Sequence, residues 1–203
     1  MTHVIRKKPV RLPWLIRMCA KQESVVFFLR WLAAPLHIGS MVPSSKCLAR
    51  AIANEIDLHS NQPVVELGGG TGRVTQALLE TGMDPDRLVV VENDAHLCAL
   101  LRHRFPQVSV VQGDASQLSE LLKPLGVDSA CSVVSGLPLL SLPKQTRDRI
   151  IRQSLQLLSD KGRFIQFTYG LASPLADFNL YGRVTARIWL NFPPASVWNF
   201  QEQ

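Results

Sequence analysis

An acidic residue followed by a run of glycines is the stretch of this chain best suited to binding a ligand. Residues 63–73 read PVVELGGGTGR, so Glu66 precedes four glycines. Glycine has no Cβ, and a run of glycines lets a ligand lie directly against the backbone. An acid in front of the glycines suits a cationic ligand, whereas the G-x-G-x-x-G pattern of dinucleotide sites binds an anionic pyrophosphate. The alternative is that the glycines only let a helix pack closely on a strand.

Further polar groups follow apolar runs at regular intervals along the chain. Glu92 follows the run RLVVV, about 20 residues after the last glycine, where an acid binds ribose hydroxyls in nucleotide-binding folds. Asp114 follows residues 108–111, and Ser135 follows residues 130–134. If these runs are parallel strands, the polar groups meet at one edge of the sheet, where α/β folds bind ligands. For Glu92 taken alone, a solvated strand end is an equally good interpretation.

The elements that must position these groups alternate between strand and helix. This alternation predicts an α/β fold with a mostly parallel sheet and helices on both faces, closed by an antiparallel hairpin. The predicted strands span residues 64–65, 87–91, 108–111, 130–134, 163–169, 184–192 and 195–200, and the predicted helices span residues 46–56, 73–79, 94–105, 116–125 and 143–158.

The composition fits one α/β domain with a substantial core, because the chain has 203 residues and 46% of them are hydrophobic. A formal net charge of +6 favours a polyanionic partner, either nucleic acid or an anionic lipid surface. The four cysteines share no C-x-x-C spacing, which is typical of a reducing compartment rather than of metal or disulfide sites. No apolar run reaches the ~18 residues of a membrane span, and the start of the chain lacks a signal-peptide pattern. We therefore expect a cytoplasmic protein without a metal, peripheral on the inner face of the membrane.

The first 35 residues place basic and aromatic side chains on one predicted helix. A basic stretch, residues 1–13, precedes a helical pattern over residues 14–34 that Pro35 ends. Basic residues together with tryptophan and phenylalanine are typical of a helix that lies in the membrane interface. The sequence thus predicts a membrane-binding segment at residues 1–35 and a globular domain at residues 36–203. The alternatives are a helix packed on the domain and an arm that binds nucleic acid.

Together these features resemble the bacterial phospholipid N-methyltransferases of the phosphatidylethanolamine type, which are related to ribosomal RNA adenine dimethylases. The resemblance implies a Rossmann-like class I methyltransferase fold with a mostly parallel seven-stranded sheet. It also implies S-adenosylmethionine as the cofactor and successive N-methylation of phosphatidylethanolamine toward phosphatidylcholine. The motifs that carry it are HIGSMVPSS at residues 37–45, ELGGGTG at 66–72, GDA at 113–115, SGLPLL at 135–140, FTYG at 167–170 and the R-x-x-x-R…W-x-N-x-P-P tail from residue 183.

The resemblance assigns cofactor contacts to the strand ends. It implies that Glu66 and the glycines hold the methionine part, Glu92 the ribose, and Asp114 with Ala115 the adenine. The residues predicted to bind the cofactor are Ser40, Glu66, Gly68, Gly69, Gly70, Thr71, Gly72, Glu92, Asn93, Gly113, Asp114, Ala115 and Ser135.

The substrate amine is expected to approach the methyl group at the end of the fourth strand. Gly136 and Leu137 would present backbone carbonyls there, and Tyr169 would contact the amine as an acceptor or through its ring face. Arg183 and Arg187, four residues apart near aromatic residues, are predicted to hold the lipid phosphate. The alternative is that both arginines are surface cations on an edge strand.

One departure from the adenine methyltransferases bears on the substrate. Those enzymes carry N/D-P-P-Y or N-L-P-Y where this chain has Gly136-Leu137-Pro138-Leu139. The missing amide and aromatic side chains argue against a flipped base, so we expect no nucleic-acid partner. Ornithine-lipid N-methylation, RNA methylation and a non-catalytic membrane-binding role are the alternatives. The sequence leaves the oligomeric state and the number of methyl groups open.

Overall fold

The computed structural model describes residues 43–169, 173, 175, 178, 180–189 and 195–201. The predicted membrane-binding segment and Ser40 therefore lie outside the described residues. Within the described part, no helix is long and apolar enough to cross a membrane.

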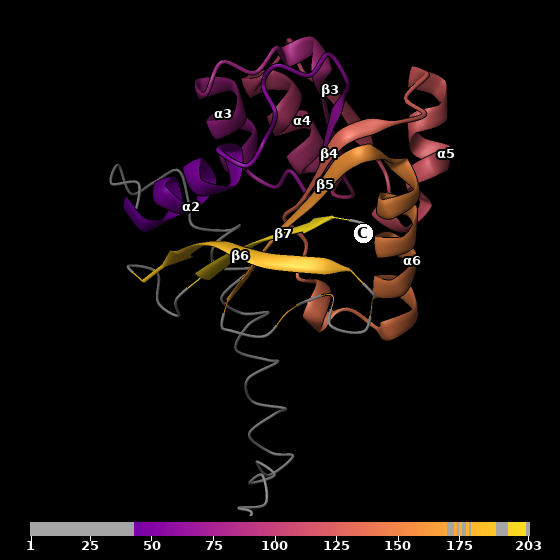
Figure 1. Cartoon of the computed structure of the whole chain (residues 1–203). Helices are drawn as coiled ribbons and strands as arrows, with labels where there is room; N and C mark the ends of the chain where they lie inside the picture. The colour runs from indigo at the N-terminus through magenta and orange to yellow at the C-terminus, as the bar shows by residue number, and fades with distance from the viewer. Residues whose placement is uncertain are drawn as a thin grey trace, which may run out of the picture.

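Seven strands form one twisted sheet in the order β3-β2-β1-β4-β5-β7-β6 (Figure 1). The first five strands in the chain pair in parallel, and β7 lies antiparallel between β5 and β6. This arrangement confirms the predicted Rossmann-like, mostly parallel seven-stranded sheet. The strands are β1 (Val64–Leu67), β2 (Leu88–Glu92), β3 (Ser109–Gln112), β4 (Ala130–Ser135), β5 (Leu158–Tyr169), β6 (Tyr181–Ile188) and β7 (Ala195–Gln201).

Helices cover both faces of the sheet, as predicted, and enclose two hydrophobic cores. One core joins the sheet to α2 (Pro43–Ala53), α3 (Arg73–Glu80) and α4 (Ala95–Arg104). The other joins it to α5 (Leu118–Leu122) and α6 (Lys144–Leu157). Central strands β1, β2 and β4 are buried along their whole length, which explains their valine-rich sequences. Short 3-10 turns complete the fold at η1 (Pro85–Arg87), η2 (Ala115–Gln117), η3 (Lys123–Leu125) and η4 (Leu139–Ser141).

Three elements begin three or more residues earlier than predicted. Helix α2 begins at Pro43 rather than Lys46, because proline at the first helical turn loses no hydrogen bond. Strand β5 begins at Leu158, directly after α6, and its pairing with β4 is irregular before Arg163. Strand β6 begins at Tyr181, three residues earlier than predicted. Its glycine, a poor strand former, leaves the space that the Phe200 ring occupies.

Candidate functional site

The carboxyl ends of β1, β2 and β4 meet at one edge of the sheet. The Gly68 N–H donates to the Val91 carbonyl at 2.8 Å, and the Gly136 N–H donates to the Leu67 carbonyl at 2.8 Å. A Cβ on Gly136 would lie 2.9 Å from the Gly68 carbonyl oxygen. The structure thus brings the glycine turn after β1 against the turn after β4, as expected for a site that joins cofactor and substrate.

Two of the four glycines are required by packing rather than by a ligand. A Cβ on Gly69 would lie 2.4 Å from the Val90 side chain and 2.9 Å from that of Leu101 in α4. Gly72 has φ +79°, and a Cβ there would lie 2.4 Å from the Phe105 ring. For Gly69 and Gly72, close packing of helix on strand is therefore a sufficient reason, as the alternative interpretation held.

The other two glycines turn the chain across the strand ends. Gly68 and Gly70 have φ of +75° and +54°, in the left-handed region that glycine adopts without strain. The Gly70 N–H donates to Glu92 Oε2 at 2.8 Å, and the Asp94 N–H donates to Glu92 Oε1 at 3.0 Å. Glu92 is 9% exposed. These two bonds hold the carboxylate at the end of β2 and leave each oxygen able to accept a further hydrogen bond, as ribose hydroxyls require.

Glu66 is buried beneath the glycine turn and is only 2% exposed. Its Oε2 accepts a hydrogen bond from the Thr75 hydroxyl at 2.7 Å. Burial raises the pKa of Glu66 to about 8, with a smaller contribution from the charge of Glu92, although the Thr75 hydrogen bonds oppose the shift. The group is therefore mostly protonated near pH 7, so the simple attraction of a carboxylate for a cation does not describe the ligand-free protein.

The ends of β2 and β3 supply exposed polar groups beside Glu92. Asp114 is exposed, and its Oδ1 accepts from the Ser116 N–H at 2.8 Å, which caps η2. Asn93 is also exposed, whereas Ala115 is 8% exposed. The Gly113 N–H donates to the Glu92 carbonyl at 2.9 Å, so the third strand end lies beside the second. This set fits a nucleoside with polar ribose and base edges, and its contacts with the cofactor stay a prediction.

The turn after β4 is held by a residue that the sequence analysis missed. Gln166 on β5 is 1% exposed, and its Nε2 donates to the Leu137 carbonyl at 3.1 Å and to the Phe167 carbonyl at 2.7 Å. Its Oε1 is buried without a hydrogen-bond partner in the described part of the chain. Ser135 Oγ accepts from the Leu137 N–H at 3.3 Å. The polar residue inside the run RFIQFTY was the signal that could have identified Gln166.

Two other supporting residues also lay outside the predicted set. The Thr75 hydroxyl anchors Glu66, as described above. Arg104, at the end of α4, donates to the backbone oxygen of Thr71 and to Gln76 Oε1, the latter at 3.1 Å. Sequence spacing gives no signal for Arg104, because it reaches the glycine turn only through the packing of α4 beside α3.

Tyr169 ends β5 opposite Ala195, at the same edge of the sheet as the glycine turns. Its side chain lies outside the described residues, so its contact with a substrate amine stays a prediction. In the part of the chain that the structure describes, no group of three or more metal-ligating side chains gathers.

The structure does not bring Arg183 and Arg187 to one face of the sheet. Arg183 pairs with Asn199, whereas Arg187 pairs with Ser196. Paired residues point to the same face of the sheet, and Asn199 and Ser196, three residues apart, point to opposite faces because side chains alternate along a strand. The register shift between Val184 and Ala186 causes this change of side. A spacing of four would have kept both arginines on one face of a regular strand, so a phosphate site shared by both is not supported.

The sequence is similar to known methyltransferases. The family described as ribosomal RNA adenine dimethylase matches residues 40–138. The chain is 37% identical over 163 residues to an ornithine lipid N-methyltransferase of Singulisphaera acidiphila, across 79% of this chain and 83% of that protein. It is 30% identical over 102 residues to ribosomal RNA small subunit methyltransferase A of Thermotoga neapolitana, across 50% of this chain and 37% of that protein.

Solved structures agree on the fold. The 1,6-didemethyltoxoflavin-N1-methyltransferase of Burkholderia thailandensis aligns with a TM-score of 0.60 at 16% identity, over 98% of this chain and 94% of that one. A TehB-like methyltransferase of Corynebacterium glutamicum aligns with a TM-score of 0.59 at 17% identity, over 92% of this chain and 100% of that one. These likenesses concern the fold alone. By the relationship to the Singulisphaera protein, the chain belongs to a family of S-adenosylmethionine-dependent methyltransferases related to the ribosomal RNA adenine dimethylases.

Proposed function

We propose that this chain N-methylates the amine of a membrane lipid, with ornithine lipid as the first candidate substrate and phosphatidylethanolamine as the second. The observation that carries this proposal is the 37% identity to an ornithine lipid N-methyltransferase over 83% of that protein. This identity favours ornithine lipid, which the sequence left as an alternative substrate, over phosphatidylethanolamine, which was expected first.

The turn after β4 gives the amine a place to bind. The Gly136 and Leu137 carbonyls would accept hydrogen bonds from its N–H groups and aim its lone pair, and Gln166 keeps the Leu137 carbonyl in place. S-adenosylmethionine, when bound, supplies an electrophilic methyl group on a sulfonium. An ammonium has no lone pair with which to attack, so the substrate ammonium first gives one proton to water and reacts as the neutral amine. Holding two reactants in line is worth up to about 7–11 kcal/mol.

A nucleobase substrate fits the same turn less well. Leu139 stands where the adenine methyltransferases carry the stacking aromatic, and it is only 1% exposed because it packs in the α6-side core. A buried aliphatic side chain offers no stacking surface to a flipped base. This observation supports a small aliphatic amine rather than adenine.

The predicted membrane-binding segment at residues 1–35 belongs to the same proposal. A basic and aromatic segment that lies in the interface would keep the enzyme on the cytoplasmic face, where anionic lipids attract positive charge.

The decisive experiment is methyl transfer from radiolabelled S-adenosylmethionine to ornithine lipid, phosphatidylethanolamine and ribosomal RNA, each offered separately. Chromatography of the lipid products would show which lipid is labelled and how many methyl groups it gains. We expect label in ornithine lipid, with Glu92→Ala as the background control. Label in RNA and in neither lipid would refute the proposal.

A further inference from the structure

The outermost strand of the sheet ends at the same edge as the candidate site. Because β7 is antiparallel to both neighbours, β6 runs in the same direction as β5. Ala195 pairs with Tyr169 on one side and with Ile188 on the other, so the ends of β5 and β6 share the edge that carries the glycine turns. Three strand spacings, about 14 Å, separate β6 from β4 across the sheet. The end of β6 also lies level with Tyr169, three residues beyond Gln166, the residue that pairs with Ser135 at the end of β4.

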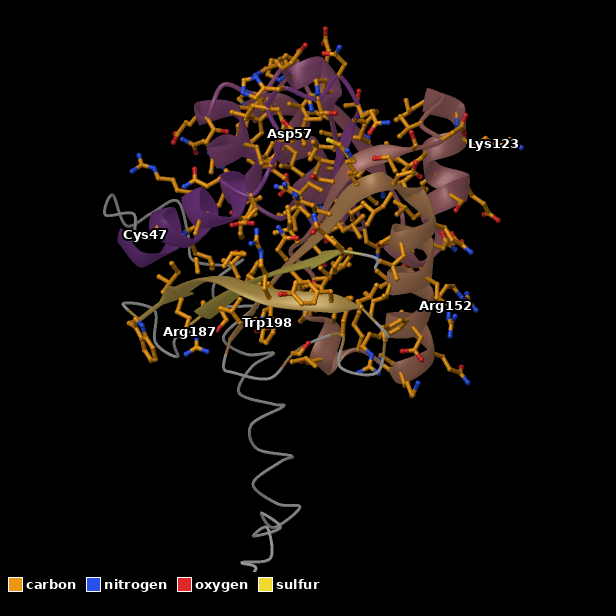
Figure 2. All side chains as sticks on the ribbon, in the orientation of Figure 1. Cys47, Asp57, Lys123, Arg152, Arg187 and Trp198 are labelled. Atoms are coloured by element: carbon orange, nitrogen blue, oxygen red, sulfur yellow. The ribbon has the colours of Figure 1, made fainter. Side chains whose placement is uncertain are left out.

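That strand end is aromatic, basic and exposed. Trp189, which follows β6, is 67% exposed and is the most exposed large hydrophobic residue of the described part. Arg187 is also exposed and lies at the left-hand end of β6 in Figure 2. Residues 181–189 contain two arginines and no acidic residue. Tryptophan and arginine at an exposed edge are the combination that membrane interfaces favour.

We propose that Arg187 and Trp189, here called the β6 tip, dock on an anionic phospholipid surface and turn the site edge of the sheet toward the bilayer. This inference rests on the proposed lipid substrate and adds the orientation of the domain. Trp189 inserts its ring at the headgroup level, while the Arg187 guanidinium binds lipid phosphate. The amine of a lipid in the same leaflet then enters at the edge where Leu137 presents its carbonyl.

Tyr181 provides the matched control. It is 61% exposed and stands on the same strand, but at the start of β6 it lies at the opposite edge of the sheet. A general loss of exposed aromatic surface would affect both residues, whereas the proposed orientation needs Trp189 alone.

The test is binding of the full chain to vesicles of phosphatidylglycerol and phosphatidylcholine, measured by sedimentation. Arg187→Ala should weaken binding roughly fivefold, the effect of one cation at an anionic surface, and Trp189→Ala should weaken it by at least as much. Tyr181→Ala should bind like the wild type. Equal vesicle binding by all variants would overturn the proposal, and so would equal losses for Trp189→Ala and Tyr181→Ala. It would also fail if Trp189→Ala and Arg187→Ala weakened binding to ribosomal RNA and left vesicle binding unchanged.

Methyl transfer to lipid in detergent micelles separates this inference from the proposed function. Micelles present the substrate without a flat anionic surface, so Trp189→Ala should methylate micellar lipid like the wild type and vesicle lipid more slowly. If the wild type methylates no lipid in either form, the proposed function fails. If Trp189→Ala methylates vesicle lipid at the wild-type rate, only the docking proposal fails.

Discussion

The buried acid Glu66 makes the stability of the protein depend on pH. Burial raises the pKa of Glu66 to about 8 in the folded chain, from 4.5 in the unfolded one. Between these values the folded state binds more protons, so the free energy of unfolding should fall as pH rises. Above pH 8 this contribution is constant. Its total size is a few kcal/mol at most, since each pKa unit corresponds to about 1.4 kcal/mol.

Glu66→Gln removes the titration and keeps the shape and the hydrogen bond to Thr75. Urea unfolding of both proteins from pH 5 to pH 9 should therefore show the variant gaining stability relative to the wild type as pH rises. Parallel stability curves for the two proteins would mean that Glu66 is already ionised at pH 5.

Gln166 should matter for turnover more than for cofactor affinity. Gln166→Met keeps the volume but removes the donor that holds the Leu137 carbonyl. A carbonyl that shifts by about 1 Å misaligns the amine, so we expect kcat to fall roughly ten- to hundredfold while the Kd for S-adenosylmethionine is unchanged.

Ser132→Ala is the matched control for this variant. Ser132 is a fully buried polar residue on the neighbouring strand, and its hydroxyl has no hydrogen-bond partner within the described residues. Its removal should leave kcat unchanged. Equal kcat for Gln166→Met and the wild type would exclude a positioning role for Gln166.

At the scale of single residues, the sequence predicted the strand-end groups because their positions follow from strand lengths. Glu92 and Asp114 stand at the ends of β2 and β3 as expected. The charge state of Glu66 and the residues that support the glycine turn could not be predicted. The protonation of Glu66 depends on complete burial, and the Arg104 contact joins residues 33 positions apart.

At the scale of elements, the glycine turn lies where α3, α4 and the sheet pack together. Gly72→Ala must adopt φ near +79° and must also displace the Phe105 ring. The left-handed backbone costs about 1–2 kcal/mol and overpacking about 1–3 more, so this variant should lose roughly 2–5 kcal/mol of stability.

Gly126→Ala measures the cost of the left-handed backbone without the cost of overpacking. Gly126 has φ +66°, and a Cβ there meets no atom within 4 Å. Thermal or urea unfolding should show a loss of only about 1–2 kcal/mol for this variant. If both variants lose the same free energy of unfolding, the Phe105 ring moves aside freely and is not tightly packed against Gly72.

Strand β6 shows where element-level prediction ends. Its existence and antiparallel pairing were predicted, and both are confirmed. The register shift near Thr185 was not, because nothing in the sequence Val184-Thr185-Ala186 marks an irregular pairing. That single shift puts Arg183 and Arg187 on opposite faces of the sheet. Arg187 and Trp189 lie at the site edge because they flank Ile188, the last residue of β6.

At the scale of the whole molecule, one edge of the sheet carries the strand-end acids, the turn after β4 and the β6 tip. The N-terminal segment, outside the described residues, is the other proposed membrane contact. Its basic and aromatic composition predicts that it supplies most of the binding energy, because each cation near an anionic surface contributes about 1 kcal/mol.

Removal of residues 1–34 tests this division of roles. The shortened chain should keep its affinity for S-adenosylmethionine, since the strand-end acids belong to the remaining domain, and should lose vesicle binding more than tenfold. Raising the salt concentration should weaken vesicle binding of the full chain, because screening acts on exposed charges. Vesicles of phosphatidylcholine alone, which carry no net charge, are the control surface. Undiminished binding of the shortened chain to anionic vesicles would assign membrane attachment to the domain itself, and would make the β6 tip the main contact rather than the orienting one.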